Sequence, residues 1–316
     1  MATHPQALFD DDDAGDLQPG PATLGPLPGI HPFSVLRTEL GPWRERRRAW
    51  HDLGMASRAG REHVTTYDGG SRWAKEKLAS INDGLSTFDP VLAEVSYEWF
   101  CPEGGSVLDP FAGGSVRGLV AGNGGYRYTG IDLSPLQVDA NDAQADDWQT
   151  RDLLAHRPAW IEGDAAEVLP ELATGAYDYV FTCPPYHNLE RYSDDPRDLS
   201  AMKWKDFAAA YREIIAESVR CLAPDRFTTW VVGDVRGSTG YYRGLPQLTV
   251  AAHEAAGARL YNDAVLMNTL GSVPLRLANQ WRASRKMGRH HQYVLTFVKG
   301  SAKAATAHLH QSAAAA

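Results

Sequence analysis

The chain has 316 residues, of which 43% are hydrophobic and 22% are charged, and its formal net charge is −8. This composition is typical of a soluble globular protein, and the length can bury a sizeable core as one large α/β domain or two smaller ones. The negative charge excludes a generic polyanion binder, so any contact with nucleic acid must come from local basic patches.

The sequence contains no apolar run of membrane-spanning length and does not begin with a signal-peptide pattern. Its three cysteines, Cys101, Cys183 and Cys221, form no Cys-x-x-Cys pair and match no zinc-ligand spacing. We therefore expect a soluble intracellular protein without a disulfide framework, a bound metal or a membrane partner.

Residues 1–42 are expected to form a disordered or loosely ordered arm. An acidic run, Asp10–Asp13, is followed by a stretch rich in proline and glycine from Pro19 to Pro32, with little apolar periodicity. Such a segment cannot bury enough apolar surface to offset the entropy of ordering.

Residues 43–86 are expected to form a basic, aromatic and helical extension. Its cationic and aromatic side chains alternate: Arg44, Arg46, Arg47, Arg48, Arg58, Arg61 and Arg72 lie among Trp43, Trp50, Tyr67 and Trp73. Arginine interleaved with aromatic residues suits a phosphate backbone and stacked bases. A solvated amphipathic helix that packs by its tryptophans explains the same pattern.

A domain spanning residues 87–300 follows, and it opens with a helix. Asp89 is placed as the N-cap, Pro90 occupies the first helical position, and apolar residues recur as far as Phe100. The helix stops before a proline and a pair of glycines.

The next segment has the pattern of a nucleotide-binding strand, turn and helix. A strand over 106–109 runs into Gly113 and Gly114, and a helix is expected over 116–121. Glycine lets the backbone turn sharply and approach a ligand, and a helix N-terminus favours polar or anionic groups. The following strand ends in Asp132, about twenty residues after the glycine turn, where an acid meets ribose hydroxyls in such folds.

Strands and helices continue to alternate to the end of the domain. Strands are expected over 126–131, 159–161, 177–182, 227–232, 260–267 and 293–298, and helices over 136–147, 204–222 and 244–256. This alternation predicts an α/β fold with a doubly wound, mostly parallel sheet and helices on both faces. A basic loop is expected between the last two strands, and residues 301–316 are expected to form a flexible tail.

Residues 177–186 combine a buried strand with a rigid end. Pro184 and Pro185 cannot donate to a sheet ladder, so the strand stops there. Ligands bind at the carboxyl edge of an open α/β sheet. The thiol of Cys183, a stiff backbone carbonyl and the ring of Tyr186 are therefore presented together, in an arrangement suited to a flat molecule.

Cys183-Pro184-Pro185-Tyr186 resembles the [D/N/S]-P-P-[Y/F/W] signature of amino-group DNA methyltransferases, which methylate N6 of adenine or N4 of cytosine, with cysteine in the first position. The segment from Asp109 to Ser115 resembles the D-P-F-x-G-x-G loop that binds S-adenosylmethionine, with the last glycine shifted. The resemblance covers roughly residues 87–300 and extends to phage and actinobacterial DNA methylases.

The resemblance implies a Rossmann-like methyltransferase fold with S-adenosylmethionine as cofactor. The residues that it assigns to the cofactor are Phe88, Asp89, Asp109, Pro110, Phe111, Gly113, Gly114, Asp132 and Asp164. It assigns catalysis to Cys183, Pro184, Pro185 and Tyr186. The Pro184 carbonyl would accept a hydrogen of the target amino group, and Tyr186 would stack on the base.

The partner that the resemblance implies is double-stranded DNA with its target base flipped out. It places the protein in restriction–modification or phage DNA modification, in the cytoplasm of a prokaryotic cell or a phage-infected host. Phosphate contacts are expected from Arg191, Arg282, Arg285, Lys286 and Arg289. Short connections leave little room for a target-recognition domain, so we expect short or relaxed sequence specificity, and a homodimer is one of the oligomeric states left open.

Cys183 leaves three alternatives open, because a neutral thiol is a weaker acceptor than Asp, Asn or Ser. It can stand in for those residues while Pro184 does most of the work. It can act as a thiolate that attacks C6 of a pyrimidine, in a C5-pyrimidine or RNA-modifying enzyme. It can also be a structural cysteine in a catalytically silent DNA-binding protein.

Overall fold

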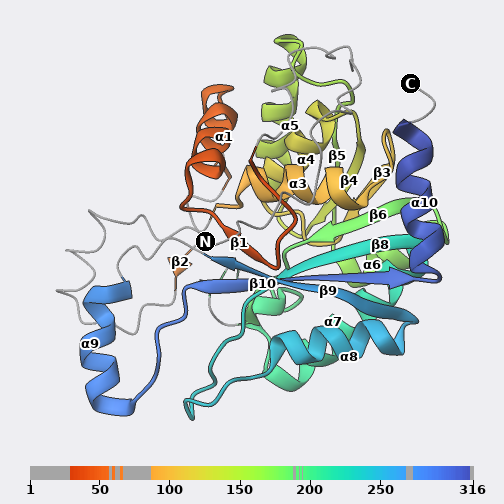
Figure 1. The fold of residues 1–316 in the computed structure, drawn as a ribbon. Coiled ribbons are helices and arrows are strands. Elements are labelled where there is room, and N and C mark those ends of the chain that lie inside the picture. The colour runs from red at the N-terminus through yellow and green to blue at the C-terminus, as the bar shows by residue number, and fades with distance from the viewer. Residues whose placement is uncertain are drawn as a thin grey trace, which may run out of the picture.

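The computed structural model describes residues 29–56, 59–60, 65–66, 87–187, 190–191, 193, 195–267 and 273–313. An eight-stranded sheet lies at the centre, in the order β1-β9-β10-β8-β6-β3-β4-β5 (Figure 1). Its strands are β1 (Val35–Arg37), β3 (Ser106–Asp109), β4 (Arg127–Asp132), β5 (Ala159–Glu162), β6 (Tyr177–Thr182), β8 (Leu222–Val232), β9 (Ala258–Met267) and β10 (His291–Lys299). A separate pair joins β2 (Thr65–Thr66) to β7 (Glu190–Arg191).

The sheet is mostly parallel. β10 runs antiparallel to both β8 and β9, whereas the other neighbouring strands pair in parallel. Parallel neighbours need crossover connections, and helices supply them. The predicted doubly wound, mostly parallel α/β sheet is therefore confirmed.

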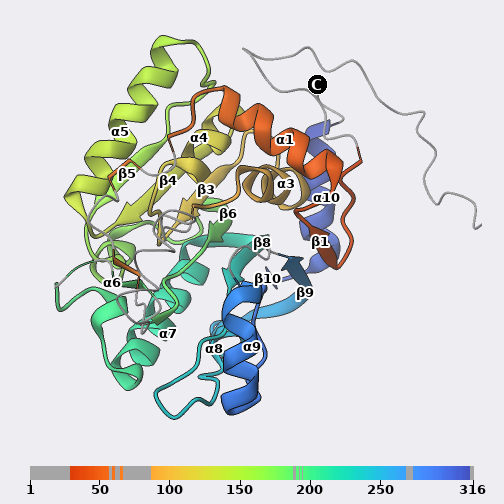
Figure 2. The ribbon, with the colours of Figure 1, turned by 90° about the vertical axis from the view of Figure 1, so that its left-hand side faces the viewer.

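Helices cover both faces of the sheet (Figures 1 and 2). They are α1 (Gly41–Asp52), α3 (Pro90–Phe100), α4 (Val116–Asn123), α5 (Pro135–Thr150), α6 (Ala165–Val168), α7 (Trp204–Cys221), α8 (Leu245–Ala255), α9 (Val273–Ser284) and α10 (Ala302–Ala313). Tyr179 and Phe181 pack with α1, α3, α4, α5 and α10 on one face, and Val180 packs with α6, α7 and α8 on the other. β6 therefore alternates its side chains between two apolar cores. None of the described helices combines the length and apolar character needed to cross a membrane.

The sheet begins earlier in the chain than the sequence suggested, because part of the expected loose arm forms β1. Val35–Arg37 pairs with β9 at the edge of the sheet. Leu36 is buried, and the Thr38 hydroxyl donates to the Met267 carbonyl at 2.6 Å. The driving force is tertiary, since the exposed edge of β9 gains a partner for its backbone groups. Residues 1–28 lie outside the described residues.

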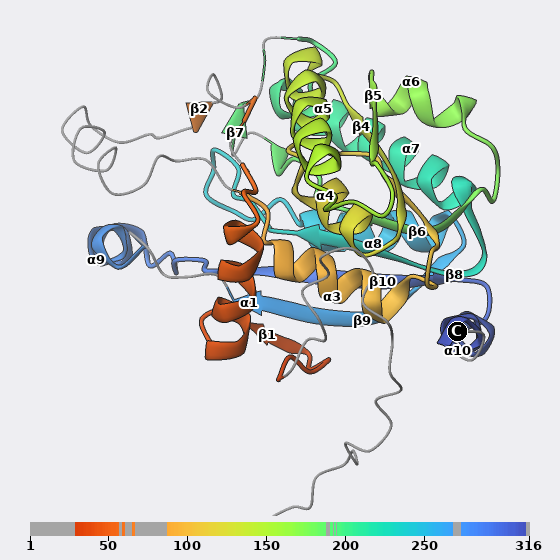
Figure 3. The same cartoon turned by 90° about the horizontal axis from the view of Figure 1, so that it is seen from above.

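Two further segments differ from expectation towards the carboxyl terminus. The basic loop between β9 and β10 contains the helix α9, which projects beyond the sheet (Figure 3). The expected flexible tail forms α10 over Ala302–Ala313, and Ala305 is buried against the sheet. Alanine has the highest helix propensity but a weak apolar signal, so this segment lacks hydrophobic periodicity although it forms a helix.

In the basic extension, α1 is a packed amphipathic helix. Trp43 and Trp50 are buried, and their indole nitrogens donate to Asp89 and Glu94 of the α3 region at 3.0 and 2.7 Å. Arg47 and Arg46 form ion pairs with the same two carboxylates. For α1 these contacts favour the packing alternative over a nucleic-acid surface. Arg58, Arg61, Tyr67, Arg72 and Trp73 lie outside the described residues.

Candidate active site

A cavity of about 390 Å³ opens at the carboxyl ends of the central parallel strands. From β3 the chain moves outwards to β4 and β5, then returns to β6 on the other side of β3. Ligands bind at such a reversal of strand order, because the connections diverge there and leave a crevice. Segments after β3, β4, β5 and β6 line the cavity, and a further wall comes from Ser193, Asp195, Arg197, Asp198 and Leu199.

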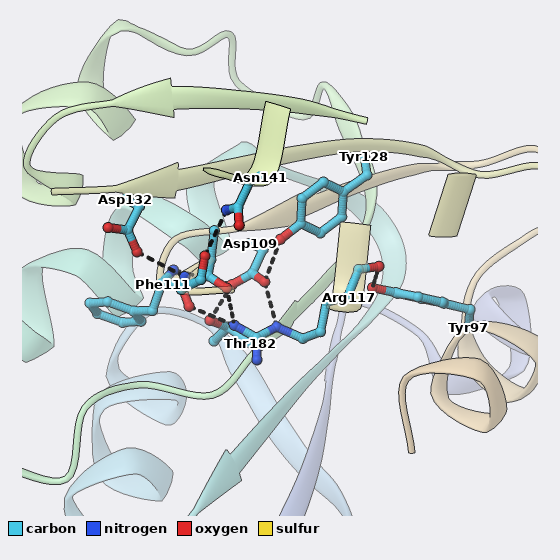
Figure 4. Close-up of polar contacts among 10 residues, drawn as sticks. Tyr97, Asp109, Phe111, Arg117, Tyr128, Asp132, Asn141 and Thr182 are labelled. Carbon is cyan, nitrogen blue, oxygen red and sulfur yellow. Dashed lines mark hydrogen bonds and ion pairs between the residues drawn. The ribbon is translucent and has the colours of Figure 1, made fainter. Parts of the chain in front are cut away.

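The loop after β3 is held from below by a buried ionic network (Figure 4). The Asp109 carboxylate is fully buried and accepts hydrogen bonds from Arg117 Nε at 2.6 Å, from the Tyr128 hydroxyl at 2.7 Å and from the Thr182 hydroxyl at 2.6 Å. These donors come from α4, β4 and β6. One carboxylate therefore ties together the elements that meet at the cavity.

Arg117 continues this network to the loop backbone. Its Nη2 donates to the Phe111 carbonyl at 2.6 Å and to the Ala112 carbonyl at 2.9 Å, and its guanidinium lies 4.5 Å from the Phe88 ring centroid. Although burial alone would lower it, the pKa of Arg117 is raised above its usual value, because the adjacent Asp109 carboxylate stabilises the cation. The ion pair therefore stays charged, and the position of the loop depends on it.

Asp132, at the end of β4, is oriented by the backbone. One oxygen accepts a hydrogen bond from Gly113 N at 2.8 Å, and the other accepts one from Ser134 N at 2.9 Å. Gly113 has φ +52°, a conformation that disfavours side chains, and its carbonyl accepts from Asn141 Nδ2 at 2.7 Å. The carboxylate lines the cavity in a fixed orientation, ready to accept further hydrogen bonds from hydroxyl groups.

The remaining wall of this part of the cavity is apolar with one further carboxylate. Asp164 follows β5, accepts a hydrogen bond from Ala166 N at 2.9 Å and borders the cavity. The larger apolar side chains of the lining are Phe111, Ile131, Leu133, Leu136, Leu199 and Ile214. Apolar walls with a few directed polar groups are typical of sites for small molecules with flat rings.

The rim after β6 forms the other side of the cavity. Of the four predicted catalytic residues, Cys183 and Pro185 line it, whereas Pro184 is buried and Tyr186 is not among the lining residues. The Tyr186 hydroxyl donates to the Val231 carbonyl at 3.3 Å and lies 3.3 Å from Cys183 Sγ. The Tyr186 ring rests against Gly233, where an added Cβ would come within 3.1 Å of it. The contacts of Tyr186 with Val231 and Gly233 thus fix the rim to β8 and the residue that follows it.

Several predicted cofactor residues lie at the cavity and others support it. Pro110, Phe111, Gly113, Asp132 and Asp164 are among the lining residues, whereas Phe88, Asp89, Asp109 and Gly114 are not. Asp89 caps α3 and pairs with Arg47, and Phe88 packs edge-on against Phe181. Asp109 acts through Arg117 on the loop.

The sequence leaves the polar stretch after the rim, which includes Ser193, Asp195 and Arg197, open as a lid or base-contacting loop or as a plain surface loop, and it does not assign the stretch to the cofactor cavity. The Ser193 backbone and hydroxyl both donate to Asp198, at 2.8 and 3.0 Å, and Arg197 pairs with Asp195 at 2.8 Å. Ser193, Asp195, Arg197 and Asp198 line the cavity. In the sequence these residues form a polar stretch of mixed charge, a pattern that is equally typical of surface loops.

The predicted phosphate contacts fall into two groups. Arg191 belongs to β7, which pairs with β2. Arg282 and Arg285 are exposed on and after α9, and Lys286 and Arg289 follow before β10. These last four residues precede β10, which pairs with β8, and none of them is among the residues that line the cavity.

Comparisons with solved structures find limited likenesses. A protein from Thermus thermophilus, described as a candidate DNA modification methylase, is 19% identical over 44% of this chain and 51% of its own, with a TM-score of 0.34. This chain therefore spans about half the length of that protein. A TehB-like SAM-dependent methyltransferase from Corynebacterium glutamicum is 16% identical over 72% of this chain and 94% of its own, with a TM-score of 0.39.

A third structure, described as a candidate sarcosine dimethylglycine methyltransferase from Galdieria sulphuraria, is 12% identical over 81% of this chain and 98% of its own, with a TM-score of 0.45. No family model and no curated protein matches the chain. The α/β architecture therefore stands on the strand order and the two helical layers described above.

Proposed function

We propose that the protein is an S-adenosylmethionine-dependent DNA methyltransferase that modifies an exocyclic amino group, N6 of adenine or N4 of cytosine. The observation that carries this proposal is the convergence of Gly113, Asp132 and Asp164 with Cys183 and Pro185 of the rim at one cavity. The cavity, at about 390 Å³, is in the range of small-molecule sites.

The donor set fits the cofactor. Asp132 offers carboxylate oxygens that suit the two ribose hydroxyls, Asp164 suits the adenine amino group, and the apolar walls suit the purine ring. Gly113 keeps the backbone close to the cavity without a side chain. When bound, the cofactor supplies an electrophilic methyl group on its sulfonium sulfur.

The rim suits the acceptor of the methyl group. The lone pair of an exocyclic amino nitrogen is delocalised into the base, so hydrogen-bond acceptors must draw on its hydrogens before it can attack. We assign this role to the Pro184 carbonyl with help from Cys183 Sγ, and we assign stacking on the base to Tyr186. Transfer would then depend mainly on alignment of the nitrogen with the methyl carbon: the N–C bond would form as the sulfonium S–C bond breaks, and the nitrogen would lose one proton to solvent.

The substrate assignment follows from where these amino groups occur. In duplex DNA they lie inside the stack, so the base has to be rotated out into the cavity, at a cost of a few kcal/mol. The anchoring of Tyr186 to β8 keeps a rigid aromatic surface in place for the extruded base.

Titration calorimetry of S-adenosylmethionine binding tests the cofactor assignment. Asp132→Asn keeps the shape but removes the charge, and we expect a loss in affinity of about tenfold or more. Asp139→Asn, an exposed residue of α5, is the matched control and should bind like the wild type. Failure of the wild type to bind the cofactor would overturn the proposal.

Incubation with tritiated S-adenosylmethionine and unmodified DNA, followed by nucleoside mass spectrometry, tests the reaction. We expect label on N6-adenine or N4-cytosine that persists in Cys183→Ser. Label on a pyrimidine ring carbon that disappears in Cys183→Ser would instead show covalent C5 chemistry. Label on RNA alone, or on neither polymer, would refute DNA amino methylation.

A further inference from the structure

The charges of this chain are distributed unevenly. No Asp or Glu occurs between Val235 and His253, and none occurs from Ala264 to the carboxyl terminus, in a chain whose net charge is −8. The cations in the first segment and in the part of the second that precedes β10 are Arg236, Arg243, Arg276, Arg282, Arg285, Lys286 and Arg289. Such separation of charge produces a locally positive potential on an acidic protein.

The first of these segments forms a hairpin that sequence reasoning did not identify. Residues 235–243 leave β8 and return to α8, with Arg236 bridged to Tyr242 and Gly237 N donating to the Tyr241 carbonyl at 2.9 Å. One Asp234 oxygen accepts hydrogen bonds from Val235, Gly244 and Leu245 N at 2.9, 3.0 and 3.2 Å. The base of the hairpin is therefore fixed to the end of β8.

Contacts join the hairpin to the stretch before β10. Two guanidiniums lie over the Tyr242 ring, with Arg236 at 3.8 Å and Arg289 at 4.9 Å from its centroid. Lys286 rests against Gly240, where an added Cβ would come within 2.6 Å of Lys286 Nζ. Figures 1 and 2 show the loop before α8 and α9 projecting on the same side of the sheet. We call the residues Arg236, Tyr241, Tyr242, Trp281, Arg282, Arg285, Lys286 and Arg289 the hairpin–α9 surface.

This surface combines cations with exposed aromatic rings. Tyr241 at the hairpin is 79% exposed, Trp281 is 40% exposed, and Arg285 lies 5.4 Å from the Trp281 ring centroid. Within the described part of the chain, none of its cations is paired with a carboxylate, whereas Arg157, for example, pairs with Asp142 and Asp146. The charges are thus available to a partner. The Tyr241 ring, 79% exposed to water, contributes little to the packing of the fold.

The surface adjoins the rim of the cavity. Gly233, two residues before the hairpin begins, packs against the Tyr186 ring. β10 is antiparallel to β8, with Tyr293 opposite Val232, so the basic stretch that precedes it lies at the same sheet edge. A polymer that reaches the rim with one unit would place its neighbouring units near this surface.

We infer that the hairpin–α9 surface binds DNA, with the arginines and Lys286 on the phosphates and Tyr241 stacked on a nucleobase. The inference rests on the proposed function, since it assigns the surface to the same DNA whose base is methylated. Cations spaced over two segments match a repeating row of phosphates better than one small anion. Exposed rings among them match bases, and each ring stacked on a base strengthens binding by a factor of about 5 to 150.

Fluorescence anisotropy with labelled duplex and single-stranded DNA, without cofactor, tests the surface. Tyr241→Ala should weaken binding about fivefold or more, and Tyr241→Phe should restore it, because the ring stacks and the hydroxyl does not. The double variant Arg282→Ala with Arg285→Ala should weaken binding and lower the slope of log affinity against log salt by about one to two. Circular dichroism verifies that each variant is folded.

Matched controls come from the opposite end of the same sheet. Tyr261→Ala and Arg259→Ala remove an exposed tyrosine and an exposed arginine of β9 that lie far from the rim, and both should bind DNA like the wild type. Three results would overturn the inference: DNA binding by the surface variants that equals that of the wild type, no DNA binding at all, or competition by polyglutamate that is as strong as competition by DNA. Surface-dependent DNA binding without methylation would uphold it while refuting the proposed reaction.

Discussion

The cavity and the hairpin–α9 surface use arginine in opposite ways. At the cavity, Arg117 is 4% exposed, and its guanidinium donates hydrogen bonds to Asp109 and to two backbone carbonyls. It therefore holds the loop after β3 in place. On the surface, Arg282 and Arg285 are exposed and have no carboxylate partner among the described residues. The buried arginine therefore serves rigidity, whereas our proposal assigns recognition of DNA to the solvated arginines.

The largest expected difference between the two regions is in stability. Arg117→Met leaves the Asp109 carboxylate buried without its cation, and we expect the free energy of unfolding to fall by about 3–5 kcal/mol. Arg282→Met, at an exposed position, should leave it nearly unchanged. Urea denaturation followed by circular dichroism measures both. Similar losses in the two variants would contradict the distinction.

The next largest expected difference is in how strongly salt affects ligand binding at the two regions. Raising the ionic strength from about 50 to about 200 mM should weaken DNA binding about 10- to 100-fold if two to four phosphates are neutralised. Binding of S-adenosylmethionine should change little, because the carboxylates assigned to it, Asp132 and Asp164, line a cavity, where salt screens charges less than in open solvent. Calorimetry and anisotropy on one preparation provide the comparison. DNA binding that is insensitive to salt would remove the electrostatic argument for the surface.

A pair of glycine substitutions tests whether the regions act independently. Gly113 in the loop after β3 has φ +52°, and Gly240 in the hairpin has φ +86°, so alanine should be strained by about 1–2 kcal/mol at each. Gly113→Ala should weaken cofactor binding and spare DNA binding, and Gly240→Ala should do the reverse. Loss of both activities in either variant would show that the two regions are coupled.

The smallest expected effect concerns pH. The pKa of His291 is lowered from its usual value, first by burial and then by the neighbouring Arg289 cation. A histidine with a lowered pKa is neutral at pH 7 and gains its charge only below about pH 6.5. The contribution of His291 to DNA affinity should therefore be flat from about pH 8 to about pH 7 and should become favourable only at lower pH. Anisotropy of the wild type and His291→Gln across this range measures the difference.

The sequence by itself determined the elements that local chemistry dictates. Proline and glycine mark the ends of strands and helices, so the turn at Gly113 and the stop after Thr182 could be predicted from residue type alone. The carboxylates at the strand ends, Asp132 and Asp164, followed because parallel strands end at one edge of a sheet. Gly113 and both carboxylates do meet at the cavity.

Only the tertiary structure decided which of the conspicuous residues face the cavity. Asp89 and Asp109 carry the same side chain as Asp132, but packing directs them to Arg47 and Arg117, at positions away from the cavity. The hairpin at residues 235–243 could not be predicted from the sequence either. Its strand pairing is a single bridge, and its shape depends on Asp234 and on stacking with Arg289. Side-chain direction and long-range contacts are absent from local sequence patterns, because they arise only when distant segments pack together.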